Sequence, residues 1–445
     1  MEKIIHHHYT IEEKQMLENI RSKAPAFAVP EKLYPVEPVL YNSKLGFPIF
    51  LISAGTEPVV RLDFIFDAGT KYQEDLFVSA CANSLLIEGT LNMNGREIAE
   101  RIDFFGSYIL PFHDRDEAGI TLYCLEKHLH DSMDLVFDML KKPSFPKEEI
   151  EIFQAKKKQS IILDRQKPEQ IARKVFLETI FGQKHPYGVH GDIIDLEKLN
   201  QDQLFHFHET FYNPLNMKMI LTSRDCSQHL PFLEQKLADW NTGETFKHPN
   251  SSVPAPENKL DGFNYIGVNQ ATQTSIRLGR VMPGRHHSDY QMLSIANTLL
   301  GGYFGSRLMQ NIREEKGYTY GIGSGLVSFK EQTILTISSN VTSVHCTEAI
   351  KECFIEMKKL REELIPEEEL FRVRNYLIGD LQRQLDGPYN IADTFKSLLF
   401  HGLDFTDLDK IQKALFTLKA EDVRDISNKY LQENEFHVIA AGPQE

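Results

Sequence analysis

The sequence predicts an α+β protein made of two tandem homologous α/β sandwich domains. Three short matches, in the same order and at nearly the same spacing, indicate that the second half of the chain repeats the first. They relate residues 82–86 to 296–300, residues 145–150 to 365–370, and residues 212–214 to 430–432. Both halves also mix strand-like and helix-like segments, which is typical of sheets packed against helices.

The segment between the matching halves predicts where the domains begin and end. Residues 241–262 are rich in Pro, Ser and Asn and have little apolar periodicity, as expected of a linker. We therefore expect an N-terminal extension at residues 1–34, a first repeat at 35–240 and a second repeat at 263–445. An extended linker of this length is able to join two repeats that face each other.

Each repeat opens with a predicted strand. Apolar side chains at Val60, Leu62, Phe64 and Phe66 alternate with polar ones at Arg61, Asp63 and Asp67. Residues 274–278 show the same alternation in the second repeat. Because a period of two is typical of a strand with one buried face, Arg61 and Asp63 are expected on the other face.

Predicted helices follow these strands. Apolar residues recur there at a spacing of three or four, at Phe77, Cys81 and Leu85 in the first repeat and at Leu293, Ala296 and Leu300 in the second. Residues 148–165 and 367–385 are long and charged. We expect both of these later stretches to be amphipathic helices.

Composition excludes several classes of function. A net charge of −14 and the lack of a dense Lys/Arg block argue against nucleic-acid binding. No apolar stretch approaches the roughly 18 residues that a membrane helix needs, so no membrane partner is expected. The five cysteines are scattered and form no Cys-x-x-Cys pair, which predicts neither disulfides nor a cysteine zinc site. We expect a cytoplasmic protein in a reducing compartment.

Several motifs together resemble the pitrilysin/insulinase family of zinc peptidases, in the short two-repeat form that includes the mitochondrial processing peptidases. They are Phe-Asp-Ala-Gly-Thr at residues 66–70, Glu-Gly-Thr at 88–90, His-Pro-Tyr-Gly at 185–188, Phe-Tyr-Asn-Pro-Leu-Asn-Met at 211–217 and a long block at 300–321. The resemblance runs from about residue 35 to the end of the chain. It implies the tandem α/β sandwich fold, arranged as half of a clamshell that encloses a peptide-cleaving chamber.

The family's zinc ligands are missing from this chain. In the family, a helix reads His-x-x-Glu-His and is followed five residues later by Gly-Thr. Counting back from Gly89 places the three ligand and base positions at Ala80, Asn83 and Ser84, which cannot replace two imidazoles and a carboxylate. The distal glutamate is also missing at residues 159–161. Since no two of the 17 histidines lie four residues apart, no other histidine zinc helix exists, and the chain is expected to bind no metal.

The resemblance also implies a second set of functional residues. The family pattern Arg-x-x-x-Gly-x-x-Tyr stands here as Arg313, Gly317 and Tyr320. Arginine offers a fixed fork of donors to a peptide or carboxylate, and a phenol can donate to the oxyanion that forms on a scissile carbonyl. Gly317 is expected to end a helix in the left-handed conformation, with Tyr318 and Tyr320 on one face of the strand that follows. Without the family, such an Arg is usually a solvated cation and such a Tyr is usually a core residue.

Gly301 and Gly302 belong to a glycine-rich segment, Gly-Gly-Tyr-Phe-Gly. The segment lacks the Gly-Lys-Ser/Thr ending of a phosphate-binding loop. We expect a turn against which substrate or a neighbouring subunit packs, and a purely structural turn is an equal alternative. The substrate-binding residues implied by the resemblance are thus Gly301, Gly302, Arg313 and Tyr320.

These features favour a non-catalytic, substrate-binding subunit of a heterodimeric zinc endopeptidase of the processing-peptidase type. A zinc-binding paralogous subunit would hold the metal, and this chain would supply Arg313 and Tyr320 in trans to cleave peptide substrates; a homodimer is the alternative assembly. A structural or assembly protein of the same fold, with no proteolytic role, is the competing interpretation. The retained Arg and Tyr favour the first interpretation, and the vacant ligand positions conflict with a stand-alone peptidase.

Overall fold

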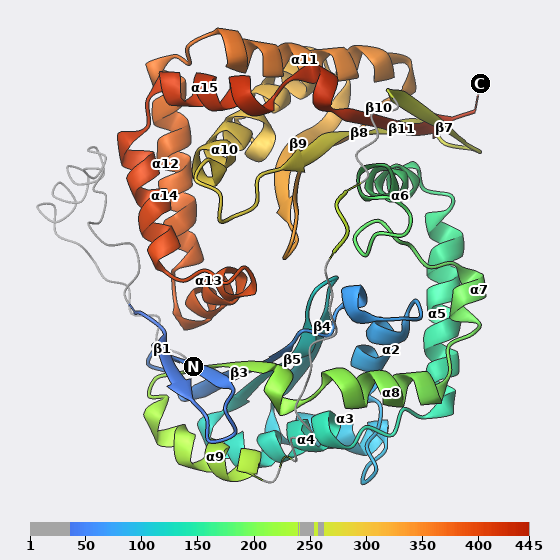
Figure 1. Ribbon diagram of the computed structural model, residues 1–445, viewed down its shortest axis with the longest axis vertical. Helices are drawn as coiled ribbons and strands as arrows, with labels where there is room; N and C mark the ends of the chain where they lie inside the picture. Colours follow the sequence, from blue (N-terminus) through green and yellow to red (C-terminus); the bar gives the residue numbers. More distant parts are fainter. Residues whose placement is uncertain (1–35, 239, 241–252, 257–261, 445) are drawn as a thin grey trace, which may run out of the picture. The chain divides into compact units, whose positions relative to one another are not determined.

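The computed structural model describes residues 36–238, 240, 253–256 and 262–444, which Figure 1 draws in colour. The expected N-terminal extension, residues 1–34, and most of the expected linker lie outside the described residues. All described residues belong to one unit, Tyr34–Glu445. This unit mixes helices and sheets, as the sequence predicts.

The first repeat mixes strands and helices. In chain order its elements are β1 (Val39–Asn42), β2 (Pro48–Ser53), β3 (Val59–Phe66), α2 (Val78–Ser84), α3 (Gly95–Phe105), β4 (Tyr108–His113), β5 (Ala118–Leu125), α4 (Leu129–Lys141), α5 (Lys147–Asp164), α6 (Pro168–Phe181), α7 (Ile193–Leu196), α8 (Gln201–Phe211), β6 (Met217–Ser223) and α9 (Leu230–Ala238). The strand predicted at residues 60–66 is β3. The helix predicted at residues 148–165 is α5.

The second repeat follows the same plan. Its elements are β7 (Phe263–Val268), β8 (Gln273–Met282), α10 (Tyr290–Asn297), two π-helical turns (Thr298–Gly302 and Met309–Glu315), β9 (Thr319–Ser328), β10 (Thr333–Thr342), α11 (Cys346–Glu362), α12 (Glu367–Gln384), α13 (Pro388–Phe400), α14 (Thr406–Thr417), α15 (Ala420–Tyr430) and β11 (His437–Pro443). The strand predicted at residues 274–278 lies within β8. The helix predicted at residues 367–385 is α12.

Local sequence explains several helix starts. Asn94 begins α3 with a capping box, in which its side chain accepts from the Glu97 amide and the Glu97 side chain accepts from the Asn94 amide. Asn200 begins α8 in the same way. Pro168 and Pro388 occupy the first turn of α6 and α13, where a missing N–H group removes no helical hydrogen bond.

The two sheets have the same topology. The strand order is β1-β2-β6-β3-β5-β4 in the first sheet and β7-β11-β8-β10-β9 in the second. Apart from β1, every strand has a counterpart: β2 runs parallel to β6 as β7 does to β11, and the other neighbours are antiparallel. The tandem α/β fold is therefore confirmed, and β4 and β9 are equivalent edge strands.

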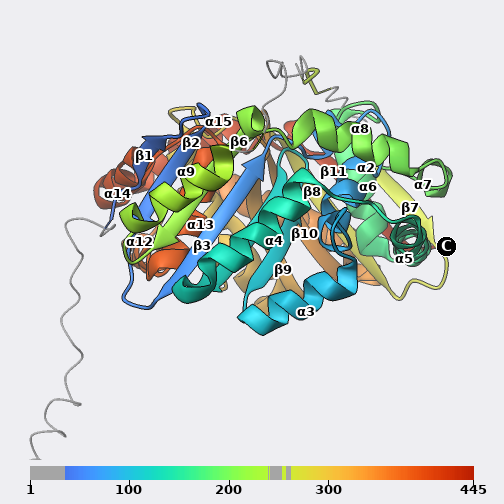
Figure 2. The ribbon, with the colours of Figure 1, turned by 90° about the horizontal axis from the view of Figure 1, so that it is seen from below.

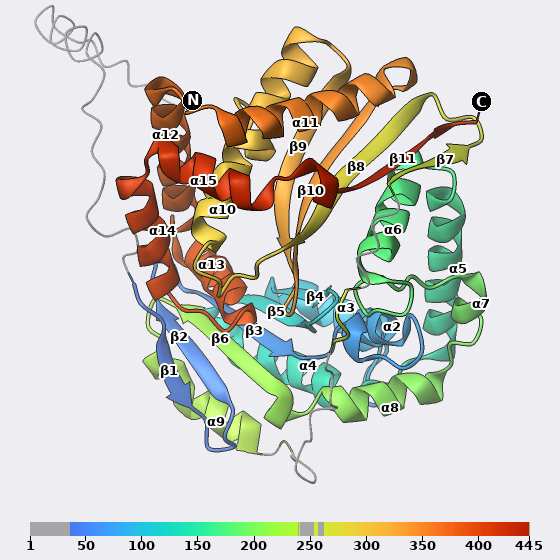
Figure 3. The same ribbon diagram turned by 45° about the horizontal axis from the view of Figure 1, so that its top comes forward.

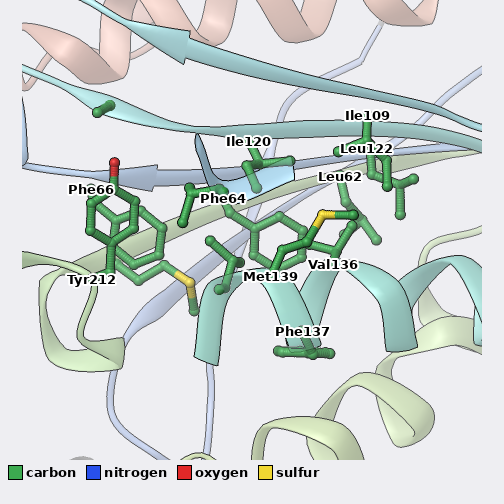
Figure 4. Close-up of a cluster of buried hydrophobic side chains, with 14 of the residues drawn as sticks. Leu62, Phe64, Phe66, Ile109, Ile120, Leu122, Val136, Phe137, Met139 and Tyr212 are labelled. Atoms are coloured by element: carbon green, nitrogen blue, oxygen red, sulfur yellow. The ribbon is translucent and has the colours of Figure 1, made fainter. Parts of the chain in front are cut away.

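One face of the first sheet forms the main core of its repeat. Apolar side chains of β3, including Phe64 and Phe66, pack against α4 and neighbouring elements, as Figure 4 shows. The rings of Phe64 and Phe137 lie 6.0 Å apart, and those of Phe66 and Tyr212 lie 4.9 Å apart. Figure 2 views the molecule from below, and in that view α4 and α9 lie in front of the strands of this sheet. Burial of one such aromatic side chain contributes about 2 kcal/mol.

The other face of β3 is also buried, which corrects the expectation of a strand with one open face. Arg61 and Asp63 are only 2% and 0% exposed, because α13 of the second repeat lies over them. Arg61 donates to Asp393 at 2.6 Å, and Lys396 donates to Asp63 at 3.0 Å. Burial opposes ionisation of Asp63, but Lys396 and Arg61 outweigh it and lower the pKa of this carboxyl.

The two repeats exchange a helix. Helix α6 of the first repeat packs against β8 and β11 of the second sheet, as Figure 3 shows, whereas α13 of the second repeat packs against β2 and β6 of the first. Phe176 and Ile180 of α6 share one buried cluster with Ile334 and Ile439. The remaining contacts of the sheets with α4 and α11 stay within each repeat. Each repeat therefore completes the other.

Two expectations from composition bear on the structure. All five cysteines are among the described residues, and each is a buried free thiol. Within the described part of the chain, no helix has both the length and the apolar character needed to cross a bilayer.

Candidate functional site

Helix α2 holds the three positions at which the family's zinc motif is missing, and it places them in three different environments. Ala80 lines a cavity of about 650 Å³. Asn83 is buried: its Nδ2 donates to the Phe112 carbonyl at 2.8 Å, and its Oδ1 accepts from the Tyr212 hydroxyl at 2.8 Å. Ser84 is exposed. The structure does not bring the three side chains together.

These residues do not fit a zinc ion. The Ala80 methyl group has no lone pair, the Asn83 amide already forms hydrogen bonds in the core, and the Ser84 hydroxyl is a poor zinc ligand. Among the residues that the structure describes, no three His, Cys, Asp or Glu side chains are grouped as a metal site would require. The side chains of this helix therefore do not fit the zinc ion that the family pattern implies there.

Both repeats line the cavity beside α2. Phe77, Arg115 and His190 come from the first repeat, whereas Phe329 and Phe400 come from the second. Phe77 was expected inside the helix but precedes it as the N-cap, with a left-handed φ of 73°. The apolar spacing with Cys81 and Leu85 could not show this, because an apolar residue just outside a helix fits the same spacing as one inside.

His113 reaches the same cavity from the end of β4. Its Nε2 lies 2.5 Å from Ser79 Oγ. Burial lowers the pKa of His113 to about 4, so the ring is neutral at pH 7. A serine beside a histidine is part of many nucleophilic sites, but Ser79 is 0% exposed and no substrate reaches its hydroxyl. The contact therefore stabilises α2 against β4.

Helix α5 places a cation near the position where the family has its distal glutamate. At that position, Ser160 donates a hydrogen bond within its own helix and Ile161 lines a second cavity. Lys157, Arg115 and Arg173 line both cavities. A positive electrostatic potential disfavours a bound metal cation. The charge of this lining and the side chains at Ala80, Asn83 and Ser84 therefore both argue against a metal at this site.

Arg313 lies in the π-helical turn Met309–Glu315, where the sequence predicts an ordinary helix. Its side chain is 34% exposed, and its guanidinium lies 4.7 Å from the centroid of the Phe304 ring. Glu314 approaches at 3.8 Å, which is too long for a hydrogen bond. Gly317 follows with a φ of 66°, the left-handed conformation expected at this position. The guanidinium fork is thus held in place by an aromatic ring and keeps its donors accessible.

Tyr320 projects from the edge strand β9 and is 92% exposed. Its hydroxyl forms no hydrogen bond within the described residues. Tyr318 differs, because it precedes the strand, which begins at Thr319, and its ring stacks on His345 with centroids 4.4 Å apart. The two tyrosines were expected to share one strand face, but of the two only Tyr320 extends into solvent.

Gly301 and Gly302 end the π-helical turn Thr298–Gly302. A Cβ atom at Gly301 would lie 2.6 Å from the Ser324 amide nitrogen of β9, so a larger residue does not fit. Gly302 is exposed. Close packing explains Gly301, whereas Gly302 is accessible to another molecule. None of Gly301, Gly302, Arg313 and Tyr320 lines the cavity beside α2.

Sequence reasoning missed the positively charged lining of that cavity. Lys157 carried a local signal, since it stands just before residues 159–161, where the family's distal glutamate would lie. Arg115 and Arg173 carried none. They lie on the β4–β5 turn and on α6, which only the tertiary fold brings together.

Sequence comparison finds relatives among zinc proteases. Residues 198–377 match a family model described as the peptidase M16 inactive domain. An uncharacterized zinc protease of Mycobacterium leprae is 26% identical over 260 residues, so the match spans 57% of this chain and 57% of that relative. An uncharacterized zinc protease of Bacillus subtilis is 22% identical over 405 residues, which are 88% of this chain and 96% of that protein.

Solved structures share the fold. A peptidase M16 inactive domain from Pseudomonas fluorescens matches with a TM-score of 0.84 at 22% identity, covering 92% of this chain and 98% of that one. A protease from Helicobacter pylori matches with a TM-score of 0.84 at 17% identity, covering 93% and 100%. At such identities, structural similarity establishes the fold and leaves activity to the residues of the site.

Proposed function

We propose that this chain is a non-catalytic, substrate-binding subunit of a heterodimeric zinc endopeptidase. The proposal is supported by its resemblance to M16 zinc peptidases over most of its length and by the match of residues 198–377 to their inactive domain. In this proposal a zinc-binding paralogous subunit holds the metal and the general base. This chain supplies Arg313 and Tyr320 to the partner's site, and the substrates are peptides in the cytoplasm.

The exposure of Tyr320 carries the proposal. A tyrosine that served the core would be buried with its hydroxyl paired, yet this side chain is 92% exposed. Arg313 is likewise held by the Phe304 ring, and its ion pair with Glu314 at 3.8 Å is too long to use up a hydrogen-bond donor. The core of this chain therefore uses neither the Tyr320 hydroxyl nor most of the Arg313 donors, whereas a second subunit would meet both side chains at the surface.

The chemistry suits a division of labour between two chains. The residues at Ala80, Asn83 and Ser84 cannot activate water, so the attacking group must come from the partner. Tyr320 can donate to the oxyanion formed on the scissile carbonyl, and Arg313 can bind the substrate backbone or carboxylate by two hydrogen bonds. Neither residue cleaves a peptide alone.

Turnover by the reconstituted pair tests the proposal. The partner is identified by affinity capture and by its intact His-x-x-Glu-His motif. Tyr320→Phe and Arg313→Ala should each lower kcat by about 100-fold, the usual effect of losing one oxyanion donor, with assembly intact. The isolated chain should cleave no peptide.

Matched variants control for surface effects. Arg424 is 36% exposed, close to the 34% of Arg313, and Tyr108 is 68% exposed on the other edge strand. Arg424→Ala and Tyr108→Phe should leave turnover unchanged. If the Tyr320 and Arg313 variants also turn over normally, the pair has no catalytic role and the structural or assembly function becomes the better account.

A further inference from the structure

Two adjoining cavities beside α2 share three cations, Arg115, Lys157 and Arg173. Their volumes are about 650 Å³ and about 320 Å³. Both are lined by Phe77, Arg115, Lys157, Arg173, His190 and Gly191. Half of these shared residues are cations at neutral pH, in a chain whose net charge is −14. The positive charge is therefore a local feature and does not follow from composition.

Among the described residues, none of the three cations forms an ion pair or a hydrogen bond with a carboxylate, although the nearby charge of Asp116 acts on Arg115. Arg115 donates to the Pro186 carbonyl at 3.0 Å. Lys157 Nζ lies 5.8 Å from the centroid of the Phe77 ring. Arg173 forms neither a hydrogen bond nor an ion pair within the part of the chain that the structure describes.

The carboxylates of the lining already have partners. Asp114 accepts from two backbone N–H groups of its own turn, each at 2.7 Å. Asp116 accepts from the Tyr187 hydroxyl at 2.7 Å. In the smaller cavity the carboxylates form ion pairs at the rim, Arg165–Asp192 and Lys167–Asp164. These carboxylates thus have other partners, and the side chains of Arg115, Lys157 and Arg173 keep hydrogen-bond donors for a ligand.

Neighbouring groups respond to this charge. Burial, and next the charge of Arg173, lowers the pKa of Arg115. Burial, and next the charge of Arg115, lowers the pKa of His190 to about 4, so the His190 ring is neutral at pH 7. Like charges held together away from water destabilise a fold until an anion offsets them.

Part of the remaining lining is apolar, and one residue of it is strained. It includes Leu76, Val189, Val327, Phe329 and Phe400. Phe77 has the left-handed φ of 73°, which bulky residues avoid, and its ring packs directly on Gly191. Strained residues of this kind cluster at ligand sites. Apolar walls with a few convergent charges suit an organic ligand better than a hydrated inorganic ion.

We propose that this cavity binds a peptide through one of its carboxylate groups, recognised by Arg115, Lys157 and Arg173. A guanidinium fork matches a carboxylate by paired, charge-assisted hydrogen bonds, and the apolar walls accommodate neighbouring side chains. The carboxylate belongs to an acidic side chain or to the peptide's C-terminus. The ligand lies beside Ala80, so an anion site has replaced the cation site of the family. The proposal concerns the isolated chain and does not depend on the role of Arg313 and Tyr320.

Fluorescence anisotropy with the purified full-length chain tests this binding. Four apolar pentapeptides carry the same neutral dye and differ only in a central Glu or Gln and in a free or amidated C-terminus. A peptide with the recognised carboxylate should bind at least tenfold more tightly than the fully neutral peptide, and less tightly as salt increases. The comparison shows which carboxylate is used. Equal affinity for all four peptides would overturn the proposal.

A pair of double variants locates the site. Lys157→Gln with Arg173→Gln should abolish the preference for carboxylate peptides, and thermal unfolding checks that the variant folds. Lys158→Gln with Arg372→Gln removes the same charge from exposed positions outside both cavities and should keep the preference. If the cavity variant keeps its preference, the site lies elsewhere and the proposal is wrong. If it does not fold, the four peptides on the wild-type chain still decide.

Discussion

Asn83 occupies the general-base position of the family motif but serves the core. Its amide bridges the Phe112 carbonyl of β4 and the Tyr212 hydroxyl, and the residue is 1% exposed. A carboxylate here would lack the N–H group that Asn83 donates to the Phe112 carbonyl. The residue type at this position is therefore set by local hydrogen bonding.

Asn83→Ala is expected to lower the free energy of unfolding by about 2 kcal/mol, because two buried polar groups lose their partner. Ser84→Ala, at the exposed neighbouring position, should change it by less than about 0.5 kcal/mol. Urea denaturation of both variants measures the difference. Similar small effects at both positions would contradict the core role of Asn83.

Glu117 is a buried carboxyl with an unusual titration. It is 4% exposed, its Oε1 forms no hydrogen bond, and Lys218 lies 3.7 Å away. Burial raises the pKa of Glu117 to about 7, although Lys218 opposes the shift. The ordinary glutamate value is 4.5.

Stability should therefore fall between pH 4.5 and 7 because of Glu117. In this window the folded protein keeps a proton that the unfolded chain has released, so raising the pH favours unfolding until both states are ionised. Glu117→Gln should remove up to about 3 kcal/mol of this decrease. The test compares urea midpoints of wild type and variant at pH 5 and pH 8, and an identical decrease in both would exclude Glu117 as its source.

At the level of elements, the sequence predicted the strands β3 and β8 and the helices α5 and α12 because their periodicity is local. It did not predict what covers them. Alternation correctly marked Arg61 and Asp63 as a polar face of β3, but the partners Asp393 and Lys396 lie more than three hundred residues away on α13. Long-range ion pairs leave no trace in a local pattern.

The same limit applies to the candidate sites. The family spacing could identify Gly317 and Tyr320 because one turn and the strand after it contain both residues. In the structure Gly317 has a left-handed φ and Tyr320 is exposed. The cavity lined by Arg115 and Arg173 depends on the packing of α6 against a distant turn. No single segment contains enough of that site to reveal it.

The contact between α6 and the second sheet depends on Gly279 of β8. A Cβ atom there would lie 2.1 Å from the Leu335 carbonyl oxygen and 2.5 Å from the Phe176 ring. Gly279→Ala should therefore lower the free energy of unfolding by about 3 kcal/mol, since backbone and helix must both move. At Gly284 no atom lies within 4 Å of an added Cβ, so Gly284→Ala should be nearly neutral. Thermal unfolding compares the two, and equal melting temperatures would refute the close packing.

At the scale of the molecule, the exchange of α6 and α13 makes the repeats interdependent. Each repeat alone would expose one face of its sheet and the apolar side of the helix that it donates, including Phe176 and Ile180. Such surfaces promote aggregation. Sequence similarity between the repeats suggests two independent domains, but the packing does not.

A chain divided within residues 241–252 should therefore fold only when both fragments are produced together. The two fragments should copurify in equal amounts and elute at the size of the intact chain, whereas each fragment alone should be insoluble or lack a cooperative unfolding transition. Size-exclusion chromatography and circular dichroism measure these outcomes. A soluble, cooperatively folded single fragment would show that the exchanged helices are dispensable.

The walls of the cavity beside α2 come from both repeats, with Arg115 from the first and Phe329 and Phe400 from the second. A ligand bound in this cavity would contact both repeats. Its binding free energy would oppose separation of the two repeats, so the chain with this cavity occupied should be more stable against unfolding than the empty chain.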